Sequence, residues 1–493
     1  MDGLQVISYV LLGLYVLPLV YITIYCLMQL HLLVKYKQDN EQNEKPDLNG
    51  HRPFVTIQLP IYNELYVVER LIDNITAIDY PKDKFEIHVL DDSNDETVDI
   101  INRKVEEYKA KGFNIERIMR DDRVGFKAGA LKAATLRAKG KYIAIFDADF
   151  LPKPSFLKDT LPYFEDPKIG IVQTRWGHVN QNYSLLTELQ AFQLNVHFTV
   201  EQRGRMAGNY LLQFNGTAGI WRKEAIDSAG GWEADTLTED LDLSYRAQLK
   251  GWEITYLEDV ISPAELPIEM NGLKSQQFRW MKGGAETAKK MLPTVWKSDL
   301  SFPKKLHASA HLLGSSVFLS VFAIGVFSVP LAFVIDDLGI GVQYFWIFII
   351  SLLAIIQVYY VANVKTAWPK EKKLKMILKF IFLFPVFLSL SMGLSLHNSV
   401  AVIQGFLGKK SAFIRTPKFN IQTIKDKLKG QIYLEQKIPL TTIFEGILAL
   451  YFACGVIGAI YTAQYAFLYM HVLLTIGYAT IFYLSVKHLA TKP

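Results

Sequence analysis

The sequence predicts an α/β domain with a mostly parallel sheet and helices on both faces, inserted into an α-helical bundle of several membrane spans. Two observations support this fold class. From about residue 52 to residue 296, short β-type runs alternate with amphipathic helical patterns, which is typical of a parallel α/β sheet. Apolar blocks longer than about 18 residues, the length of a membrane-spanning helix, lie before and after this segment. The 493-residue chain is accordingly 50% hydrophobic, with a mean hydropathy of +0.15.

The first apolar block, Val6–Val34, continues into Lys35 and Lys37 and lacks a small-residue cleavage site. We therefore expect a membrane anchor and not a removable signal; the length disfavours the alternative of a buried core helix. The other predicted spans are Ala308–Ile335, Val342–Val364, Met376–Met392, Ile443–Tyr461 and Ala466–Val486. Either the weakly apolar stretch Leu394–Phe406 closes a short hairpin, or one of the neighbouring apolar blocks does not cross the membrane.

Basic residues gather beside the apolar blocks, at Lys365, Lys370, Lys372, Lys373, Lys375, Lys409 and Lys410. By the positive-inside tendency, the α/β domain and the polar stretch Gly408–Thr441 both face the cytoplasm. An even number of crossings must then separate them. The net charge of +5 is mild and the domain mixes both signs, so nucleic-acid binding is not expected. Cys26 and Cys454 lie in apolar blocks and supply neither a disulfide framework nor a metal cluster.

The predicted organisation has seven parts: a membrane helix (1–37), a linker (38–51), the α/β domain (52–270), amphipathic interface helices (271–306), membrane helices (307–407), a cytoplasmic segment (408–441) and a membrane hairpin (442–493). Within the domain, the expected strands are Val55–Leu59, Phe85–Leu90, Ile115–Met119, Tyr142–Phe146, Ile169–Thr174 and Trp252–Tyr256. The expected helices are Leu65–Ala77, Glu96–Ala110, Lys127–Lys139, Leu185–Val200 and Leu273–Lys290.

Asp147-Ala148-Asp149 follows a buried strand and is the strongest chemical signal. Ligands of open α/β sheets bind beyond the carboxyl ends of the strands. Alternate residues of an extended segment point to one side, so both carboxylates can face one divalent cation, Mg²⁺ or Mn²⁺, that bridges a diphosphate. A solvated turn is the alternative interpretation of the same residues.

Asp91 and Asp92 end a second strand, where a carboxylate can accept hydrogen bonds from a nucleobase or ribose. The alternative is that Asp92, Ser93 or Asp95 caps the helix that begins near Glu96.

Two further segments are predicted to contact a nucleotide. Tyr62 and Glu64 lie in the loop after the first strand, at the same sheet edge. Lys127 lies at a helix start, where the helix N-terminus and the ammonium both favour phosphate. An ordinary solvated lysine is the alternative, and the spacing of a Walker motif is absent.

Thr238-Glu239-Asp240 opens an amphipathic helix. Transfer of a sugar to a hydroxyl needs a base, and a partly desolvated carboxylate with a raised pKa can serve. Asp240 is our candidate, with Glu239 in the same catalytic signature. Alternatively, Thr238 caps the helix and the acids favour its dipole.

Two remaining segments suggest an acceptor platform. Gln276, Arg279 and Trp280 share one helical face, on which Arg279 can pair with a departing diphosphate and Trp280 can stack on a sugar; an interfacial Trp/Arg belt is the alternative. The small polar run at Asn215-Gly216-Thr217 lets an acceptor approach the backbone, unless it is a plain turn.

In this order, the residues resemble the D, DxD, TED, QxxRW pattern of processive family 2 glycosyltransferases of the cellulose synthase superfamily. The supporting runs are Val89-Leu-Asp-Asp-Ser93, Gly125-Phe-Lys-Ala-Gly-Ala-Leu131, Ile145-Phe-Asp-Ala-Asp-Phe150, His197-Phe-Thr-Val-Glu-Gln202 and Phe214-Asn-Gly-Thr-Ala-Gly-Ile-Trp221. The chain looks most similar to the cellulose-synthase-like A and C branches, the β-mannan and xyloglucan-backbone synthases. The run from Phe413 to Lys418, which includes Thr416, is similar to the family's FxVTxK gating loop, with Arg415 in place of valine.

The resemblance implies a GT-A fold, inversion at the anomeric carbon and a β-linked polymer. By position, it implies that Asp147 and Asp149 hold the metal and diphosphate, that Asp91 or Asp92 contacts the nucleotide and that Asp240 is the base. It places Gln276, Arg279 and Trp280 along the acceptor and diphosphate. Thr238 departs from the mannan branch, which usually has valine there, and neither a RING nor a PilZ domain is recognisable.

The predicted function is therefore a membrane-embedded β-glycosyltransferase that elongates a β-1,4-glucan or mannan from UDP-glucose or GDP-mannose and exports it through its spans. A bacterial inner membrane and a Golgi membrane both fit. One alternative is a non-processive transferase to a lipid acceptor, which the gating-loop-like run disfavours. The other is a transporter with a non-catalytic domain, but few ionisable residues lie inside the predicted spans.

Overall fold

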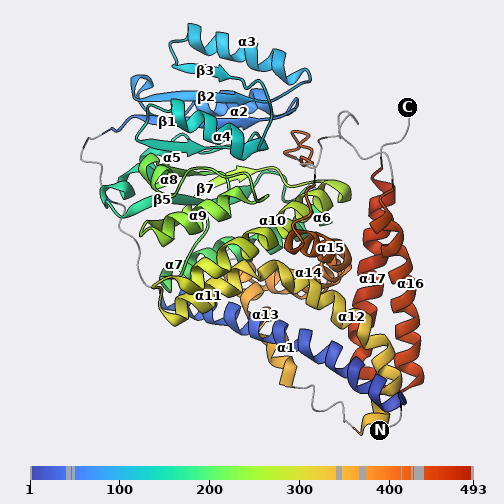
Figure 1. The fold of residues 1–493 in the computed structure, drawn as a ribbon. Helices are drawn as coiled ribbons and strands as arrows, with labels where there is room; N and C mark the ends of the chain where they lie inside the picture. Colours follow the sequence, from blue (N-terminus) through green and yellow to red (C-terminus); the bar gives the residue numbers. More distant parts are fainter. Residues whose placement is uncertain are drawn as a thin grey trace.

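The computed structural model describes residues 3–39, 46, 50, 52–339, 347–365, 373–411, 414–423, 426 and 438–489. A seven-stranded sheet forms the centre of the α/β domain, in the order β3-β2-β1-β4-β6-β5-β7 (Figure 1). Its strands are β1 (Val55–Ile61), β2 (Phe85–Asp91), β3 (Ile115–Ile118), β4 (Tyr142–Ile145), β5 (Ile169–His178), β6 (Gly219–Arg222) and β7 (Glu253–Ala264). All six expected strands are present, and the mostly parallel α/β class is confirmed.

β6 is the strand that the sequence analysis missed. It pairs antiparallel with β4 on one side and with β5 on the other, whereas β1 pairs in parallel with β2 and β4. Its four residues, Gly219–Arg222, are too few to show a period. They are nevertheless fully enclosed, because β6 is a central strand.

Strand alternation divides the apolar residues of β4 between two cores. Tyr142 and Ala144 belong to the core that contains Leu71 of α2 (Val68–Thr76), while Ile143 and Ile145 belong to the core that contains Leu131 of α4 (Phe126–Arg137). Successive strand residues point to opposite faces, so a strand covered on both faces reads as a continuous apolar run. Such burial fixes the register and therefore the position of the residues that follow each strand.

The expected helix Leu185–Val200 is divided in the structure. α6 (Leu185–Val196) begins at a capping box made by Ser184 and Thr187, and a π-helical turn, His197–Glu201, leads into α7 (Gln202–Ala207). Periodicity alone does not reveal such a turn, which is often found at functional sites.

Among the residues that the structure describes, five helices are long and apolar enough to cross a membrane: α1 (Gly3–Gln38), α12 (Val317–Val334), α14 (Lys373–Gly393), α16 (Leu440–Tyr461) and α17 (Tyr465–Lys487). The expectation of a multi-pass membrane protein is thereby confirmed. Figure 1 shows α1 running beneath the domain and α16 and α17 forming a hairpin at one side.

Two predicted spans differ from the structure. Ala308–Ile335 is not one helix, because α11 (Phe302–Leu312) ends before a short turn at Gly314–Ser316, after which α12 begins. The described part of Val342–Val364 holds a shorter apolar helix, Ile349–Val364, of which α13 is the α-helical portion. The remainder of that prediction, residues 342–346, lies outside the described residues.

α10 (Met270–Lys297) connects the domain to the bundle, and α15 (Ser395–Phe406) lies along it (Figure 1). Their approach is close: a Cβ on Gly405 would lie 2.6 Å from the Lys282 carbonyl oxygen. α15 is therefore the helix that the weakly apolar stretch Leu394–Phe406 forms, and it packs on α10.

Candidate active site

A cavity of about 240 Å³ opens at the carboxyl ends of β1, β2 and β4. The lining includes most of the predicted site residues: Tyr62, Glu64, Asp92, Lys127, Asp147, Asp149, Asn215, Gly216, Glu239, Asp240, Gln276, Arg279, Trp280, Thr416 and Lys418. The structure thus brings together residues that are more than 350 positions apart in the sequence, at the sheet edge where ligands of such folds bind.

Asp147 and Asp149 lie in a turn, not on an extended segment as expected. The Phe150 amide donates to the Asp147 carbonyl oxygen at 3.1 Å, which closes the turn directly after β4. The two carboxylates have different cationic partners: Asp147 Oδ1 is 2.5 Å from Lys127 Nζ, and Asp149 Oδ2 is 2.7 Å from Lys418 Nζ. Both carboxylates still line the cavity.

Lys127 links this turn to the base candidate. Its ammonium also donates to the Gly216 carbonyl oxygen at 3.0 Å. Gly216 has a φ of +77°, and a Cβ there would lie 3.0 Å from Asp240 Oδ2, so the position requires glycine for both conformation and space. Thr217 does not line the cavity; its hydroxyl accepts from the Asp147 amide at 2.8 Å and supports the turn.

Asp240 stands in the first turn of α9 (Glu239–Leu249). Burial raises the pKa of its carboxyl to about 7, and the neighbouring Glu239 carboxylate adds to the rise while the Lys127 ammonium opposes it. Thr238 makes no side-chain cap; its hydroxyl lies 3.0 Å from the Thr287 hydroxyl of α10. The alternative of a capping threonine is therefore wrong, and the pKa is suited to general-base chemistry.

The two acids that end β2 have separate surroundings. Asp91 is buried and accepts from Arg117 Nε at 2.8 Å and from the Ser93 amide at 2.9 Å, and it does not line the cavity. Asp92 lines the cavity and is held by a two-pronged contact with Arg120. Of the two, only Asp92 is placed to meet a ligand in the cavity.

The helix-cap alternative at this strand end is only partly correct. Asp95 accepts from the Thr97 amide at 3.0 Å, whereas Asp92 pairs with Arg120 instead. The start of α3 (Thr97–Ala110) therefore leaves Asp92 available to the cavity.

The loop after β1 contributes an aromatic ring and an acid. The Arg123 guanidinium lies 3.1 Å from the centre of the Tyr62 ring. Glu64 Oε2 is 2.8 Å from Arg415 Nη1, and burial raises the pKa of the Glu64 carboxyl to about 7, with Arg415 opposing the rise. Arg415, the departure from the gating-loop pattern, is therefore the partner of a predicted nucleotide-site residue.

Residues 409–411 and 414–423 form a strap across the cavity, held from both sides. On the α10 side, Lys282 donates to the Lys409 carbonyl oxygen at 2.5 Å, and Arg279 donates to the Thr416 hydroxyl at 2.8 Å. Phe413 lies outside the described residues.

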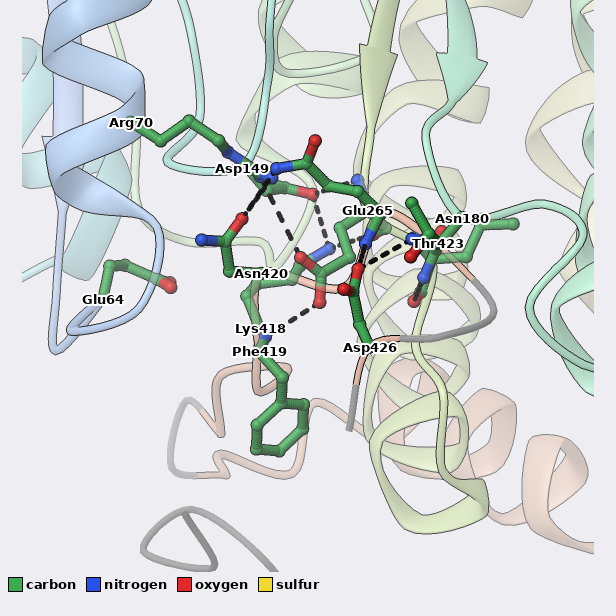
Figure 2. A network of polar contacts seen from close by, with 12 residues as sticks. Glu64, Arg70, Asp149, Asn180, Glu265, Lys418, Phe419, Asn420, Thr423 and Asp426 are labelled. Carbon is green, nitrogen blue, oxygen red and sulfur yellow. Dashed lines mark hydrogen bonds and ion pairs between the residues drawn. The ribbon is translucent and has the colours of Figure 1, made fainter. Parts of the chain in front are cut away.

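On the sheet side, the strap meets Glu265, which directly follows β7. Figure 2 shows Lys418 reaching Asp149 and the Glu265 backbone, while the Phe419 amide donates to Glu265 Oε1 at 2.8 Å. Arg70 Nη1 of α2 donates to Asn420 Oδ1 at 2.6 Å. Glu265 was not among the predicted site residues, because the expected strand ended at Tyr256 whereas β7 continues to Ala264.

Residues 51–283 match the family profile described as glycosyltransferase like family 2. The Arabidopsis thaliana protein glucomannan 4-beta-mannosyltransferase 2 is 32% identical over 454 residues, which cover 88% of this chain and 82% of that protein. The chain belongs to glycosyltransferase family 2. The predicted family is thereby confirmed.

Other relatives of this glycosyltransferase match a shorter part. The rice (Oryza sativa subsp. japonica) protein probable glucomannan 4-beta-mannosyltransferase 7 is 42% identical over 264 residues, and the match covers 52% of this chain and 45% of that protein. A match to probable glucomannan 4-beta-mannosyltransferase 9 of rice, at 40% identity, likewise covers 52% of each chain. The chain thus spans about half the length of these rice relatives.

The structure of the mannosyltransferase PcManGT of Pyrobaculum calidifontis, solved with GDP-Man and Mn²⁺, is similar in fold. Its TM-score is 0.52 at 19% identity, and the similarity covers 83% of this chain and all of that one. The fold expected for a family 2 glycosyltransferase is therefore confirmed.

The glycosyltransferase has a second cavity, of about 470 Å³, next to the first. Both cavities are lined by Thr238, Asp240, Asn215 and Trp280. The second extends between α1, α12, α13 and α14, where its lining includes Val321, Ile355, Tyr359, Phe387 and Met392. Asp240 therefore stands where a space in the domain meets a space in the bundle.

The upper wall of the second cavity is polar. His197 of the π-helical turn contacts Glu201 at 2.9 Å and Asn215 at 2.8 Å, and His311 contacts Gln213 at 2.9 Å. Arg205 lines the same wall. These side chains form a hydrogen-bonded polar wall in the part of the second cavity that adjoins Asp240.

The glycosyltransferase also has an acid cluster away from the cavities. Carboxylate oxygens of Glu233, Asp235 and Asp242 lie within 4.8 Å of one another. Lys290 Nζ contacts all three, at 2.6, 2.8 and 3.0 Å, and Arg246 also pairs with Asp242. An ammonium already stands among these oxygens, so we interpret the cluster as an ion-pair network that joins α9 to α10.

Proposed function

We propose that this protein transfers mannose from GDP-mannose to the end of a growing β-1,4-linked mannan or glucomannan. The observation that carries the proposal is the position of Asp240, a partly buried carboxylate between a cavity lined with acids and lysines and a cavity that enters the bundle. The relatives' names favour mannose as the sugar, and the complex of the structural neighbour favours GDP-mannose over UDP-glucose as the donor.

The first step in the proposed reaction is removal of a proton. Asp240 takes the proton of the acceptor hydroxyl, whose oxygen then forms a bond to the anomeric carbon. The bond from that carbon to the diphosphate oxygen breaks, and the electron pair leaves with the nucleoside diphosphate. Attack from the face opposite the leaving group inverts the configuration, which gives a β linkage from an α-linked donor.

The chain's own cations suit the leaving group. Lys127 stands at the start of α4 and Arg279 on the facing helix, so both can pair with diphosphate oxygens without moving far. Trp280, which lines both cavities, offers an aromatic face to the sugar at the junction. Asn215 and Gly216 complete the acceptor side, where the glycine leaves room for a sugar against the backbone.

Asp147 and Asp149 fit Mg²⁺ or Mn²⁺, because they offer the carboxylate oxygens that both cations prefer. Both line the cavity, and each is neutralised by a lysine that a bound cation would have to replace or accompany. When bound, the cation supplies charge neutralisation for the diphosphate as it leaves. With the cation on Asp147 and Asp149, Lys127 and Lys418 would be able to pair with the phosphates.

The second cavity supports a role in elongation and export. Polar side chains below Asp240 suit sugar hydroxyls, and the aromatic rings of Tyr359 and Phe387 deeper in the bundle suit the apolar faces of sugar rings. A lipid acceptor would use only the apolar part of this cavity, whereas a polysaccharide would also use its polar wall. The basic residues beside the spans favour a cytosolic position for the domain.

The test uses the full chain in detergent or nanodiscs, offered GDP-mannose and UDP-glucose separately with a manno-oligosaccharide acceptor. We expect incorporation from GDP-mannose and a ladder of β-1,4-linked products by linkage analysis. A single addition to a lipid extract, with the oligosaccharide unextended, would support the lipid-acceptor alternative and contradict elongation.

A further inference from the structure

One buried ion pair lies inside the bundle, away from both cavities. Lys274 Nζ of α10 is 2.8 Å from Glu445 Oε2 of α16 and donates to the Thr442 hydroxyl at 2.9 Å. Both charged side chains are almost completely enclosed, with exposed fractions of 4% for Lys274 and 0% for Glu445. Ionisable residues within membrane bundles are costly and are therefore candidates for function.

The pair is the centre of a larger contact, which we call the α10 node. The node comprises Met270, Asn271, Lys274, His397, Thr442, Glu445, Ser485 and His488. The Asn271 amide donates to the Ser485 carbonyl oxygen at 3.2 Å, and the Met270 amide donates to His488 Nδ1 at 3.0 Å. His397 of α15 contacts the Lys274 carbonyl oxygen at 2.9 Å.

The α10 node therefore ties the first turns of α10 to three other helices, α15, α16 and α17. Arg279 and Trp280 follow on the same helix, five and six residues after Lys274, or about 8 Å along its axis. A rigid helix transmits a shift of its first turns to these two side chains in the active-site cavity.

The node is poorly suited to a role in stability alone. An apolar pair of similar size at such a site is often as stable as a buried ion pair or more so, because the charges lose their hydration. Moreover, Glu445 Oε1 is buried with no hydrogen-bond partner among the described residues. A buried ion pair whose desolvation costs stability is better explained by the position in which it holds α10.

We propose that the Lys274–Glu445 pair is a positioning device for the transfer step. It fixes the start of α10 against the C-terminal hairpin and thereby sets where Arg279 and Trp280 stand relative to Asp240. This inference rests on the proposed function of the site. Neither Lys274 nor Glu445 lines either cavity, so the pair acts through α10 and not by contact with the substrate.

The decisive variants change the geometry while keeping the fold. Glu445→Asp retains the charge but withdraws the carboxylate by about 1.5 Å, one carbon–carbon bond. The double variant Lys274→Met/Glu445→Leu replaces the pair with apolar side chains of similar volume. For both, we expect kcat with GDP-mannose to fall roughly 10- to 100-fold, the usual effect of a misplacement of about 1 Å.

Two readouts separate positioning from general damage. The affinity for GDP, measured by calorimetry, should stay within about twofold of wild type, and the melting temperature of the double variant should stay near the wild-type value. Lys274→Arg, which can still donate to Glu445 and Thr442, should keep most of the activity. Ser328→Ala is the matched control, because Ser328 makes a buried 2.9 Å contact with His471 elsewhere in the bundle and should leave kcat unchanged.

Wild-type kcat in Glu445→Asp, or in a folded double variant, would overturn the inference and leave the proposed function intact. A double variant that does not fold would show a structural pair, unless Glu445→Asp folds, binds GDP and loses turnover, which supports positioning. Failure of the wild-type protein to transfer from any sugar nucleotide would instead overturn both the function and this inference.

Discussion

Two of the clusters of acids with lysine partners in the glycosyltransferase invite comparison, because only the first of them adjoins a cavity. In the first, Asp147 and Asp149 pair with Lys127 and Lys418. In the second, Glu233, Asp235 and Asp242 surround Lys290, and Arg246 also pairs with Asp242. By the spacing of carboxylate oxygens, the second cluster is the better metal site.

The two clusters differ in how their lysines neutralise the carboxylates. Lys290 contacts every acid of its cluster and Arg246 contacts Asp242, so most of that negative charge is neutralised within the protein. Lys127 and Lys418 each hold one carboxylate of the DxD turn, and Lys418 belongs to the strap, which joins the cavity from a segment about 270 residues away. The first cluster therefore differs from the second in lining a cavity and in having one counter-charge carried by the strap.

Removal of divalent metal should have the largest effect, because it should abolish activity through the first cluster and leave the second cluster unaffected. We expect EDTA to abolish transfer from GDP-mannose, and Mg²⁺ or Mn²⁺ to restore it, because the DxD carboxylates provide the oxygen ligands. The melting temperature should scarcely change, since Lys290 satisfies the other cluster without metal. Undiminished synthesis in EDTA would contradict the metal assignment.

Asp240→Asn should reduce kcat by roughly 10²- to 10⁴-fold, the usual contribution of a general base. The amide has nearly the same shape but cannot accept the acceptor's proton. Binding of GDP, measured by calorimetry, should be largely unaffected. Turnover close to wild type in this variant would remove Asp240 from the role of base.

The pH dependence should report the same carboxyl. Its pKa of about 7 means that the ionised base is lost below pH 7, so kcat/KM should fall about tenfold per pH unit on the acid side. Because the folded-state pKa lies above the usual value of 3.8, the fold loses stability as pH rises from about 3.8 to about 7. Asp240→Asn should therefore melt higher than wild type at pH 8, and this difference should shrink as the pH falls below 7 toward 3.8.

Lys418→Met should raise the KM for GDP-mannose about tenfold, the effect of losing roughly one charge-assisted hydrogen bond. The strap would then lose its contact with Asp149 while Arg279 still holds Thr416. Initial rates over a range of donor concentrations provide the measurement. A changed kcat with constant KM would instead place Lys418 in the chemical step.

Substitutions in the second cluster should have the smallest effects. Glu233→Gln and Asp235→Asn remove partly exposed partners of Lys290 and should lower the free energy of unfolding by less than about 1 kcal/mol. Activity should remain within about twofold of wild type. Loss of activity with metal-dependent rescue would make this cluster a second cation site.

Much of the fold and site could be predicted from local patterns. Residues that follow buried strands, such as Asp92 and Asp147, were identified because the carboxyl ends of parallel strands share one edge. Asp91 was identified by the same rule but faces away from the cavity, because the sequence does not specify which of two neighbouring acids Arg117 holds.

Contacts between distant segments were beyond such reasoning. The pairing of Lys418 with Asp149, or of Lys274 with Glu445, depends on how the bundle packs against the domain, for which a single sequence contains no local signal. The π-helical turn at His197–Glu201 was missed because its residues are equally compatible with an α-helix.

The second cavity also has a consequence for the membrane itself. A space that reaches from the α/β domain into the bundle is a potential leak for protons and salt. Its deeper lining of Val321, Ile355, Phe387 and Met392 is apolar, and an apolar passage tends to lose its water when no sugar fills it. The same apolar side chains would thus keep the membrane electrically tight between rounds of synthesis.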